Sequence, residues 1–185
     1  MSRFTIILFL LNIYTPTFSS MTDKVISQMQ YSNSLSFNFT QLINEKKENG
    51  SCIIKYPKKI YCEYDGSNKK IIVSNGKTLV IKNINNENYY IYPLKKTPLE
   101  FLLDRNYLVS KIKYLEPKII DNKFLAFSIL GNNNNEIKIF FNKDSLILTG
   151  WQTEDIYQNL IITFISSVKL NQEVDEKNFI LPKNN

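Results

Sequence analysis

Two cysteines are the residues of this chain best suited to form a covalent bond, and their spacing favours a disulfide. Cys52 and Cys62 each lie five residues from Pro57, and proline favours the first central position of a turn. If a hairpin turns at Pro57, the cysteines oppose each other with Cβ atoms about 4.5–5.5 Å apart, slightly wider than a disulfide prefers. We predict a cross-strand disulfide with a structural role. A pair of buried free thiols is the alternative.

Histidine is absent from the 185 residues, which removes the usual base of nucleophilic catalysis and a common zinc ligand. Two cysteines are too few for a closed thiolate zinc site. The five glycines form no phosphate-binding loop, and most acidic residues, such as Asp175 and Glu176, should lie in solvated loops. We therefore expect no catalytic residue, no metal and no cofactor. An exported enzyme acting on lipid or cell wall is the least favoured interpretation.

The chain carries 23 basic and 17 acidic residues, a formal charge of +6. Such a charge can attract nucleic acid or a membrane surface. The lysines are scattered, however, and lysine, asparagine and isoleucine recur throughout the sequence. A general compositional bias explains the charge, so nucleic acid is not an expected partner.

The first 19 residues have the pattern of a signal peptide. Met1–Arg3 gives a positive start, Phe4–Ile13 is an apolar run, and Thr17 and Ser19 are small residues at the −3 and −1 positions of a cleavage site. The apolar run is shorter than the about 20 residues that a membrane-spanning helix needs. We expect cleavage near Ser19 and a single exported domain over residues 20–185.

Short β-prone runs follow and should position the cysteines. Leu35–Gln41 alternates apolar and polar residues, as in an antiparallel sheet exposed on one side. Lys46–Gly50 is polar and is predicted to be a turn. Asn75-Gly76 favours a tight type I′ turn between two strands. Further strands are expected at 87–92, 124–130, 136–141, 145–151 and 159–168, for a total of about nine to eleven.

Two short helices are also predicted. Met21–Tyr31 has apolar residues at helical spacing, with Thr22 as its N-cap. Thr97 is a suitable N-cap for a second helix that begins at Pro98 and ends near Leu103. The apolar side chains of that helix must rest on the sheet or on a ligand. Residues 108–114 fit either a strand or a helix.

Five motifs stand in the order and spacing of the LolA family, the periplasmic carriers of outer-membrane lipoproteins. They are Phe39–Gln41, Lys55–Pro57, Ile71–Thr78, Thr97–Leu99 and Phe179–Pro182, and the resemblance covers roughly residues 25–182. It implies a mainly β fold with short α-helices: an unclosed antiparallel half-barrel with a helical lid over an apolar cavity. It also implies a monomer in the periplasm whose cargo is the acyl chains of triacylated lipoproteins. Its partners would be an inner-membrane ABC transporter that releases lipoproteins and an outer-membrane receptor lipoprotein.

Candidate cavity residues follow from strand alternation together with this resemblance. They are Leu35, Phe37, Phe39, Ile54, Tyr56, Ile60, Cys62, Ile72, Leu79, Ile81, Phe101 and Leu102. For each of them, an ordinary place in the core is the alternative.

The lid-latch position of the family corresponds to Tyr56. An arginine commonly stands there in the family, just before the turn proline, and is thought to hold the lid. Tyrosine offers one hydroxyl in place of a charged fork of donors, so the latch mechanism is open in this chain.

A second interpretation keeps the fold and changes the task. A related half-barrel can sense lipids or lipoproteins and regulate a membrane-bound signalling protein, or can bind lipids generally. Such sensors usually carry an additional domain, for which we expect no room in 185 residues.

Overall fold

The computed structural model describes residues 20–44, 46–66, 69–85, 88–130, 136–154 and 158–183. The predicted signal peptide at 1–19 lies outside the described residues, as do residues 131–135 between the strands predicted at 124–130 and 136–141. The described part contains the helices α1 (Met21–Tyr31), α2 (Leu99–Leu103) and α3 (Arg105–Ile112), and the 3-10 turns η1 (Leu94–Lys96) and η2 (Glu176–Phe179). Its strands are β1 (Ser34–Ile43), β2 (Lys46–Lys55), β3 (Lys59–Tyr64), β4 (Lys70–Asn75), β5 (Thr78–Asn83), β6 (Tyr89–Pro93), β7 (Lys118–Ile120), β8 (Phe124–Leu130), β9 (Glu136–Asn142), β10 (Leu148–Glu154) and β11 (Leu160–Leu170).

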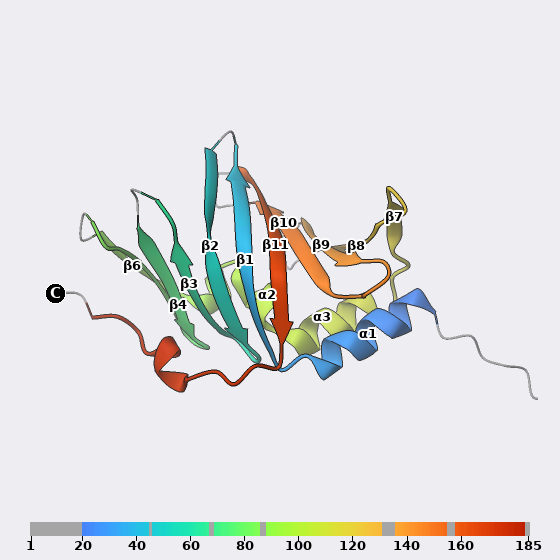
Figure 1. Cartoon of the computed structure of the whole chain (residues 1–185), viewed down its shortest axis with the longest axis horizontal. Coiled ribbons are helices and arrows are strands. Elements are labelled where there is room, and N and C mark those ends of the chain that lie inside the picture. Colours follow the sequence, from blue (N-terminus) through green and yellow to red (C-terminus); the bar gives the residue numbers. More distant parts are fainter. Residues whose placement is uncertain are drawn as a thin grey trace, which may run out of the picture.

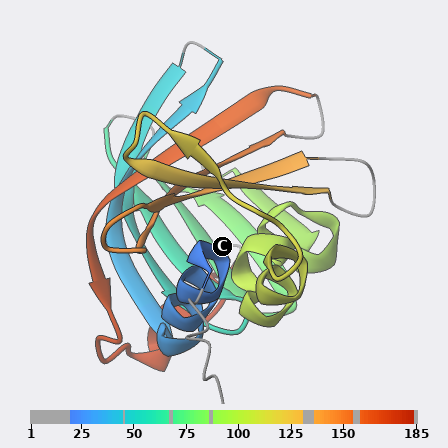
Figure 2. The same cartoon turned by 90° about the vertical axis from the view of Figure 1, so that its right-hand side faces the viewer.

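All eleven strands join in one antiparallel sheet with the order β6-β5-β4-β3-β2-β1-β11-β10-β9-β8-β7. The first and last strands of the chain segment, β1 and β11, pair in the middle, so β6 and β7 are the two edges. The sheet curls, as twisted strands do, around the helices on its concave side (Figures 1 and 2). The predicted unclosed half-barrel is thereby confirmed. We call α1, α2 and α3 the lid.

One apolar core fills the space between the sheet and the lid. In β1 the alternating residues Leu35, Phe37 and Phe39 are buried, as the sequence predicts. On the opposite side of the half-barrel, β8 and β9 contribute their own alternating residues, such as Phe127 and Phe141, whose rings meet edge to face. The two halves of the sheet therefore share a single core.

The outer face of the sheet carries a second, smaller buried region. Val73 and Val80 alternate with core-facing neighbours and are nevertheless almost fully buried. η2 contacts β3 and β4 on this outer side (Figure 1) and buries Phe179. The carboxylate of Glu176 forms salt bridges to Lys55 at 2.6 Å and Lys59 at 2.7 Å. The C-terminal segment thus packs against the outer face of the β2–β3 hairpin.

The polar run Lys46–Gly50 is a strand, and its prediction as a turn is wrong. It extends β2 in register with β1, from Lys46 opposite Ile43 to Gly50 opposite Phe39. Ion pairs replace apolar packing here, since Glu48 lies 2.9 Å from Lys46 and 2.7 Å from Lys70. A Cβ at Gly50 would collide with the Glu63 carbonyl oxygen, so the strands can approach here only with glycine.

Both predicted N-caps are wrong. Ser20 caps α1 in a reciprocal capping box with Asp23, while the buried Thr22 donates its hydroxyl to the Leu115 carbonyl at 2.8 Å. Thr97 likewise donates its hydroxyl to the Leu94 carbonyl at 2.8 Å, and its backbone N–H donates to the same oxygen at 2.9 Å. Pro98 then takes the cap position of α2.

Several further predictions need adjustment. Residues 105–112 are helical, with the Asp104 side chain accepting from the Tyr107 N–H at 3.0 Å, and the short edge strand β7 was not predicted. The hairpin at Asn75-Gly76 is present, but its loop is Gly76-Lys77, and of the predicted pair only Gly76 has a positive φ. Asn75 instead accepts two backbone bonds through its side chain. Among the described helices, none is long and apolar enough to cross a bilayer.

Candidate functional site: an apolar pocket under the lid

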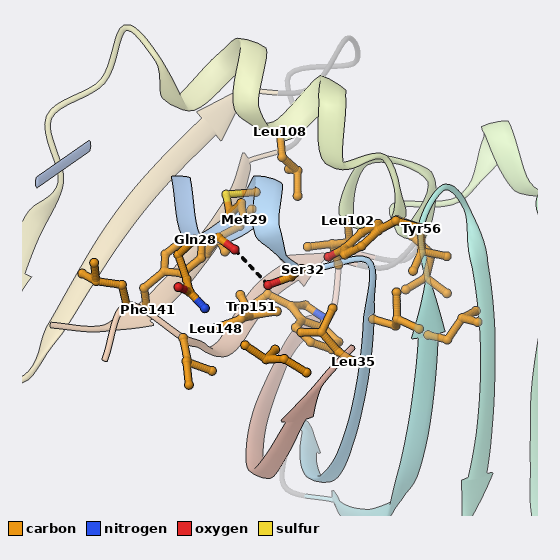
Figure 3. Close-up of a pocket in the computed structure, with 18 residues that line it drawn as sticks. Gln28, Met29, Ser32, Leu35, Tyr56, Leu102, Leu108, Phe141, Leu148 and Trp151 are labelled. Atoms are coloured by element: carbon orange, nitrogen blue, oxygen red, sulfur yellow. Dashed lines mark hydrogen bonds between the residues drawn. The ribbon is translucent and has the colours of Figure 1, made fainter. Parts of the chain in front are cut away.

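An apolar pocket lies between the concave face of the sheet and the lid (Figure 3). Side chains from both halves of the sheet and from all three helices line it: Gln28, Met29, Ser32, Leu35, Ile54, Tyr56, Ile60, Leu99, Leu102, Leu103, Leu108, Ile139, Phe141, Leu146, Ile147, Leu148, Trp151 and Leu170. Its free volume is about 40 Å³. One water molecule occupies roughly 30 Å³ in the liquid, so the protein's own side chains almost fill the space.

Five of the twelve candidate cavity residues line this pocket: Leu35, Ile54, Tyr56, Ile60 and Leu102. The other seven lie around it. Phe37, Phe39, Cys62 and Leu79 are buried in the surrounding core, Ile72 and Phe101 are half-buried against it, and Ile81 is half-buried opposite Ile72. The structure therefore brings five of the candidates together under the lid and leaves six strand residues, and Phe101 on α2, outside the pocket.

Aromatic packing explains why two candidates stay outside the pocket. The ring of Phe37 packs edge-on against Trp151, with centroids 6.2 Å apart. The ring of Phe39 meets Tyr64 at 4.8 Å, one step farther along β1. Strand alternation assigned these rings to the correct face but could not say how far the lid reaches along it.

The sequence analysis missed the part of the pocket that comes from α1, β9 and β10. Met29, Phe141, Leu148 and Trp151 are the main examples (Figure 3). The strand predicted at 136–141 is present as β9, and its residues 137, 139 and 141 are buried on one face. Only the pairing of β1 with β11 places that face across the pocket from β2 and β3.

Cys52 and Cys62 form a disulfide, which confirms the predicted pairing. They occupy directly opposed positions on β2 and β3 and are both buried. The next residues on the same face, Ile54 and Ile60, line the pocket. The disulfide therefore fixes the two strands immediately beside the pocket.

The turn between β2 and β3 holds the lid through Lys58. Its ammonium group lies 3.2 Å from Glu100 on α2 and 3.3 Å from Asp104 at the start of α3. Its backbone N–H donates to the Leu103 carbonyl at 2.8 Å. The bond to Glu100 raises the pKa of Lys58, so the ammonium stays charged at neutral pH. One residue of the β2–β3 turn thus contacts both α2 and the start of α3.

Arg105, the first residue of α3, joins the lid helices to each other. Its Nη1 atom lies 3.1 Å from the Gln30 carbonyl, 2.9 Å from the Ser32 carbonyl and 3.1 Å from Asn33 Oδ1, all at the end of α1. Its guanidinium carbon is also 5.7 Å from the centre of the Tyr56 ring. No spacing pattern in the sequence indicates these contacts, and the sequence analysis missed Arg105.

Tyr56, the predicted latch position, contributes its ring to this arrangement. Within the described residues no hydrogen bond reaches its hydroxyl. Burial raises the pKa of Tyr56 to about 12, so the phenol is neutral at physiological pH. In the described chain, no charged side chain lines the pocket, and no cluster of three or more acidic or cysteine side chains could hold a metal ion. The pocket is built to enclose apolar groups.

The family model described as outer membrane lipoprotein carrier protein LolA matches residues 30–181. The chain belongs to the LolA family. No curated protein sequence matches it. The match spans all eleven strands and the three lid helices apart from most of α1.

Solved structures show similar folds at very low sequence identity. An uncharacterized conserved protein from Thermus thermophilus has a TM-score of 0.53 at 7% identity, covering 88% of this chain and 93% of its own. A LolA superfamily protein from Nitrosomonas europaea has a TM-score of 0.49 at 8% identity, with coverages of 88% and 99%. A putative outer membrane lipoprotein-sorting protein domain from Vibrio parahaemolyticus has a TM-score of 0.46 at 8% identity, with coverages of 84% and 94%.

Proposed function

We propose that this LolA-family protein is a periplasmic carrier that encloses the acyl chains of lipoproteins after their release from the inner membrane. It delivers them to the outer membrane and catalyses no reaction. The observation that carries the proposal is the apolar pocket beneath a lid that polar contacts hold in place. The chain's membership of the LolA family points to lipoprotein cargo.

The pocket must open before it can take an acyl chain. A free volume of about 40 Å³ leaves no room for one, so the lid side chains Leu99, Leu102 and Leu103 have to withdraw. Each methylene of the cargo that is buried gains about 0.8 kcal/mol. The lid's own apolar side chains must lose comparable contacts when they leave. Cargo binding is therefore weaker than the buried area alone would give.

This competition suits a carrier, because a carrier has to release what it binds. A two-state lid shifts only as far as the cargo's preference for the open state allows. A closed state that is already well packed lowers the affinity and makes transfer to a receptor easier. The partners in this scheme are an inner-membrane ABC transporter on the loading side and an outer-membrane receptor lipoprotein on the delivery side. The carrier acts as a monomer, and residues 1–19 direct its export to the periplasm and are then cleaved.

Release of lipoproteins from spheroplasts of a Gram-negative bacterium tests this function. The purified mature protein should bring a triacylated lipoprotein into the medium. Leu102→Asp places a charge in the pocket and should abolish release, because an unpaired charge in an apolar site is strongly unfavourable. Leu130→Asp, at a side chain that is 69% exposed, is the matched control and should release normally.

A second pocket variant protects the test against simple misfolding. Leu99→Asn changes a half-buried lid residue and should keep the circular dichroism spectrum of the wild type while reducing release. Equal release by wild type, Leu102→Asp and Leu99→Asn would contradict the carrier proposal.

A further inference from the structure

Four of the side chains that line the apolar pocket carry polar atoms: Gln28, Ser32, Tyr56 and Trp151. The Ser32 hydroxyl is used internally, since it donates to the Gln28 carbonyl at 2.9 Å. Among the described residues, no hydrogen bond reaches the Gln28 side-chain amide, the Tyr56 hydroxyl or the Trp151 indole N–H. Three polar groups in an otherwise apolar pocket therefore have no partner in the closed protein.

These three groups have access to the pocket. Buried polar groups in proteins are normally hydrogen-bonded, and in the described part of the chain the Tyr107 hydroxyl is the one fully enclosed side-chain atom without a partner. The polar atoms of Gln28, Tyr56 and Trp151 are therefore not fully enclosed by the protein. Figure 3 shows the Gln28 amide pointing in from α1 and the Tyr56 hydroxyl from the opposite side, with Trp151 between them. They converge on one space from α1, the β2–β3 turn and β10.

The chemistry of the three groups indicates what they would bind. The indole N–H is a donor only, the phenol is a donor at every physiological pH because its pKa is raised to about 12, and the amide offers two N–H donors. No cation lines the described pocket, so a free carboxylate would find no charge partner there. A neutral acceptor beside apolar chains fits best. Ester and amide carbonyl oxygens at the base of acyl chains have this character.

We propose that Gln28, Tyr56 and Trp151 form a carbonyl-binding subsite that recognises ester- and amide-linked acyl chains when the lid opens. This proposal rests on the proposed function and identifies the carbonyl oxygens of the cargo's acyl chains as the groups that accept hydrogen bonds from the pocket. The pocket then distinguishes acyl chains joined through carbonyls from plain hydrocarbon chains of the same length.

A pair of matched lipids tests the subsite. One is a diacyl glycerolipid with two ester bonds, and the other is its dialkyl ether analogue with the same head group and chain length. Each displaces a neutral fluorescent probe, N-phenyl-1-naphthylamine, from the mature protein. We expect the wild type to bind the ester lipid about three- to tenfold more tightly than the ether lipid, the ratio that one hydrogen bond supplies.

Variants assign the preference to the three side chains. Gln28→Met, Tyr56→Phe and Trp151→Phe each keep most of the side-chain volume and remove the donor. Each should lower the ester-to-ether ratio and leave the affinity for the ether lipid nearly unchanged. Tyr114→Phe removes a phenol from a side chain that is 82% exposed and does not line the pocket, and it should keep the wild-type ratio.

The outcomes separate this inference from the function on which it rests. Equal wild-type affinity for the two lipids, or an unchanged ratio in all three donor variants, would overturn the subsite and leave the carrier proposal standing. Failure of the wild type to bind either lipid would overturn both.

Discussion

The guanidinium group of Arg105 lies over the ring of Tyr56, with its central carbon 5.7 Å from the ring centroid, and bonds at the same time to the end of α1. Tyr56 in the β2–β3 turn and the end of α1 therefore both contact the guanidinium group of Arg105 on α3. The arginine that the family commonly places before the turn proline is absent here, and the lid itself supplies a guanidinium on the other side of the contact. This arrangement makes Arg105 the lid contact whose loss should matter most.

Replacing Arg105 with glutamine should loosen the lid. The change removes a charged donor shared among three oxygens, and hydrogen bonds to charged groups contribute about 1.5–3 kcal/mol each at most. We expect hydrogen exchange in residues 99–112 to accelerate by about tenfold or more, while exchange in β1 and β2 stays unchanged. Tyr56→Phe keeps the ring and should change lid exchange only slightly.

Lys24→Gln makes the same change of charge on the exposed side of α1 and serves as the control. Exchange rates in the lid that are the same in Arg105→Gln and Lys24→Gln would show that Arg105 does not hold the lid.

Shortening Leu102 should weaken the free protein and strengthen lipid binding. Leu102 is buried and lines the pocket, and Leu→Ala substitutions in cores cost about 2–5 kcal/mol. The substitution destabilises mainly the closed state, in which Leu102 fills the pocket. In the open state a bound acyl chain fills that space instead. Leu102→Ala should therefore show a lower melting temperature and a lower dissociation constant for lipid.

Leu125→Ala provides the comparison, since Leu125 is fully buried but does not line the pocket. It should lower the melting temperature without tightening lipid binding. If both variants change lipid affinity alike, the lid does not compete with cargo for the pocket.

Removing the disulfide should reduce stability without removing the binding site. Cys52 and Cys62 are separated by 10 positions, and closing a loop of this size stabilises a protein by about 2–3 kcal/mol in the chain-entropy model. The double variant Cys52→Ala/Cys62→Ala should unfold at a lower urea concentration and still bind lipid. Intact-mass measurement of the wild type with and without a reducing agent should show a shift of about two daltons, one hydrogen for each cysteine. Absence of that shift would contradict the crosslink.

Acid should detach the C-terminal segment from the back of the sheet. Hydrogen bonds from Lys55 and Lys59 lower the pKa of Glu176 from its ordinary value of 4.5 to about 2. Because the pKa of Glu176 is lowered in the folded state, its ion pairs with Lys55 and Lys59 stabilise the fold fully above pH 4.5. This stabilisation is lost as the pH falls toward 2. We expect the nuclear magnetic resonance signals of Phe179 to shift in that window.

Glu176→Gln should abolish this acid transition, because glutamine has no proton to gain. Persistence of the same transition in Glu176→Gln would assign it to another carboxyl group.

Local patterns in the sequence were sufficient for most of the strands and for the disulfide, whereas the half-barrel was implied by the resemblance to the LolA family. Alternation in β1 assigned Leu35, Phe37 and Phe39 to the correct face, and the position of Pro57 set the register that pairs Cys52 with Cys62. These features depend on residues that are neighbours along the chain or across one hairpin. Lys46–Gly50 was misassigned because its strand is stabilised by ion pairs and by a close approach at Gly50, neither of which leaves an apolar pattern.

The composition of the pocket could be predicted only in part, because it depends on long-range pairing. Ile54 and Ile60 come from the recognisable hairpin, whereas Trp151 reaches the pocket because β10 pairs with β11 and β11 pairs with β1. Arg105 acts on carbonyls more than 70 residues away in the chain. Its role depends on how α1 and α3 cross, and no spacing in the sequence encodes that crossing.

The mass of the molecules that co-purify with the mature protein from the periplasm tests the carrier function most directly. The sample should be extracted without detergent and compared with the Leu102→Asp variant, whose pocket carries a charge. A carrier predicts a triacylated lipopeptide in the wild type and none in the variant. Phospholipid alone, or an empty wild-type protein that also fails to release lipoproteins from spheroplasts, would contradict it.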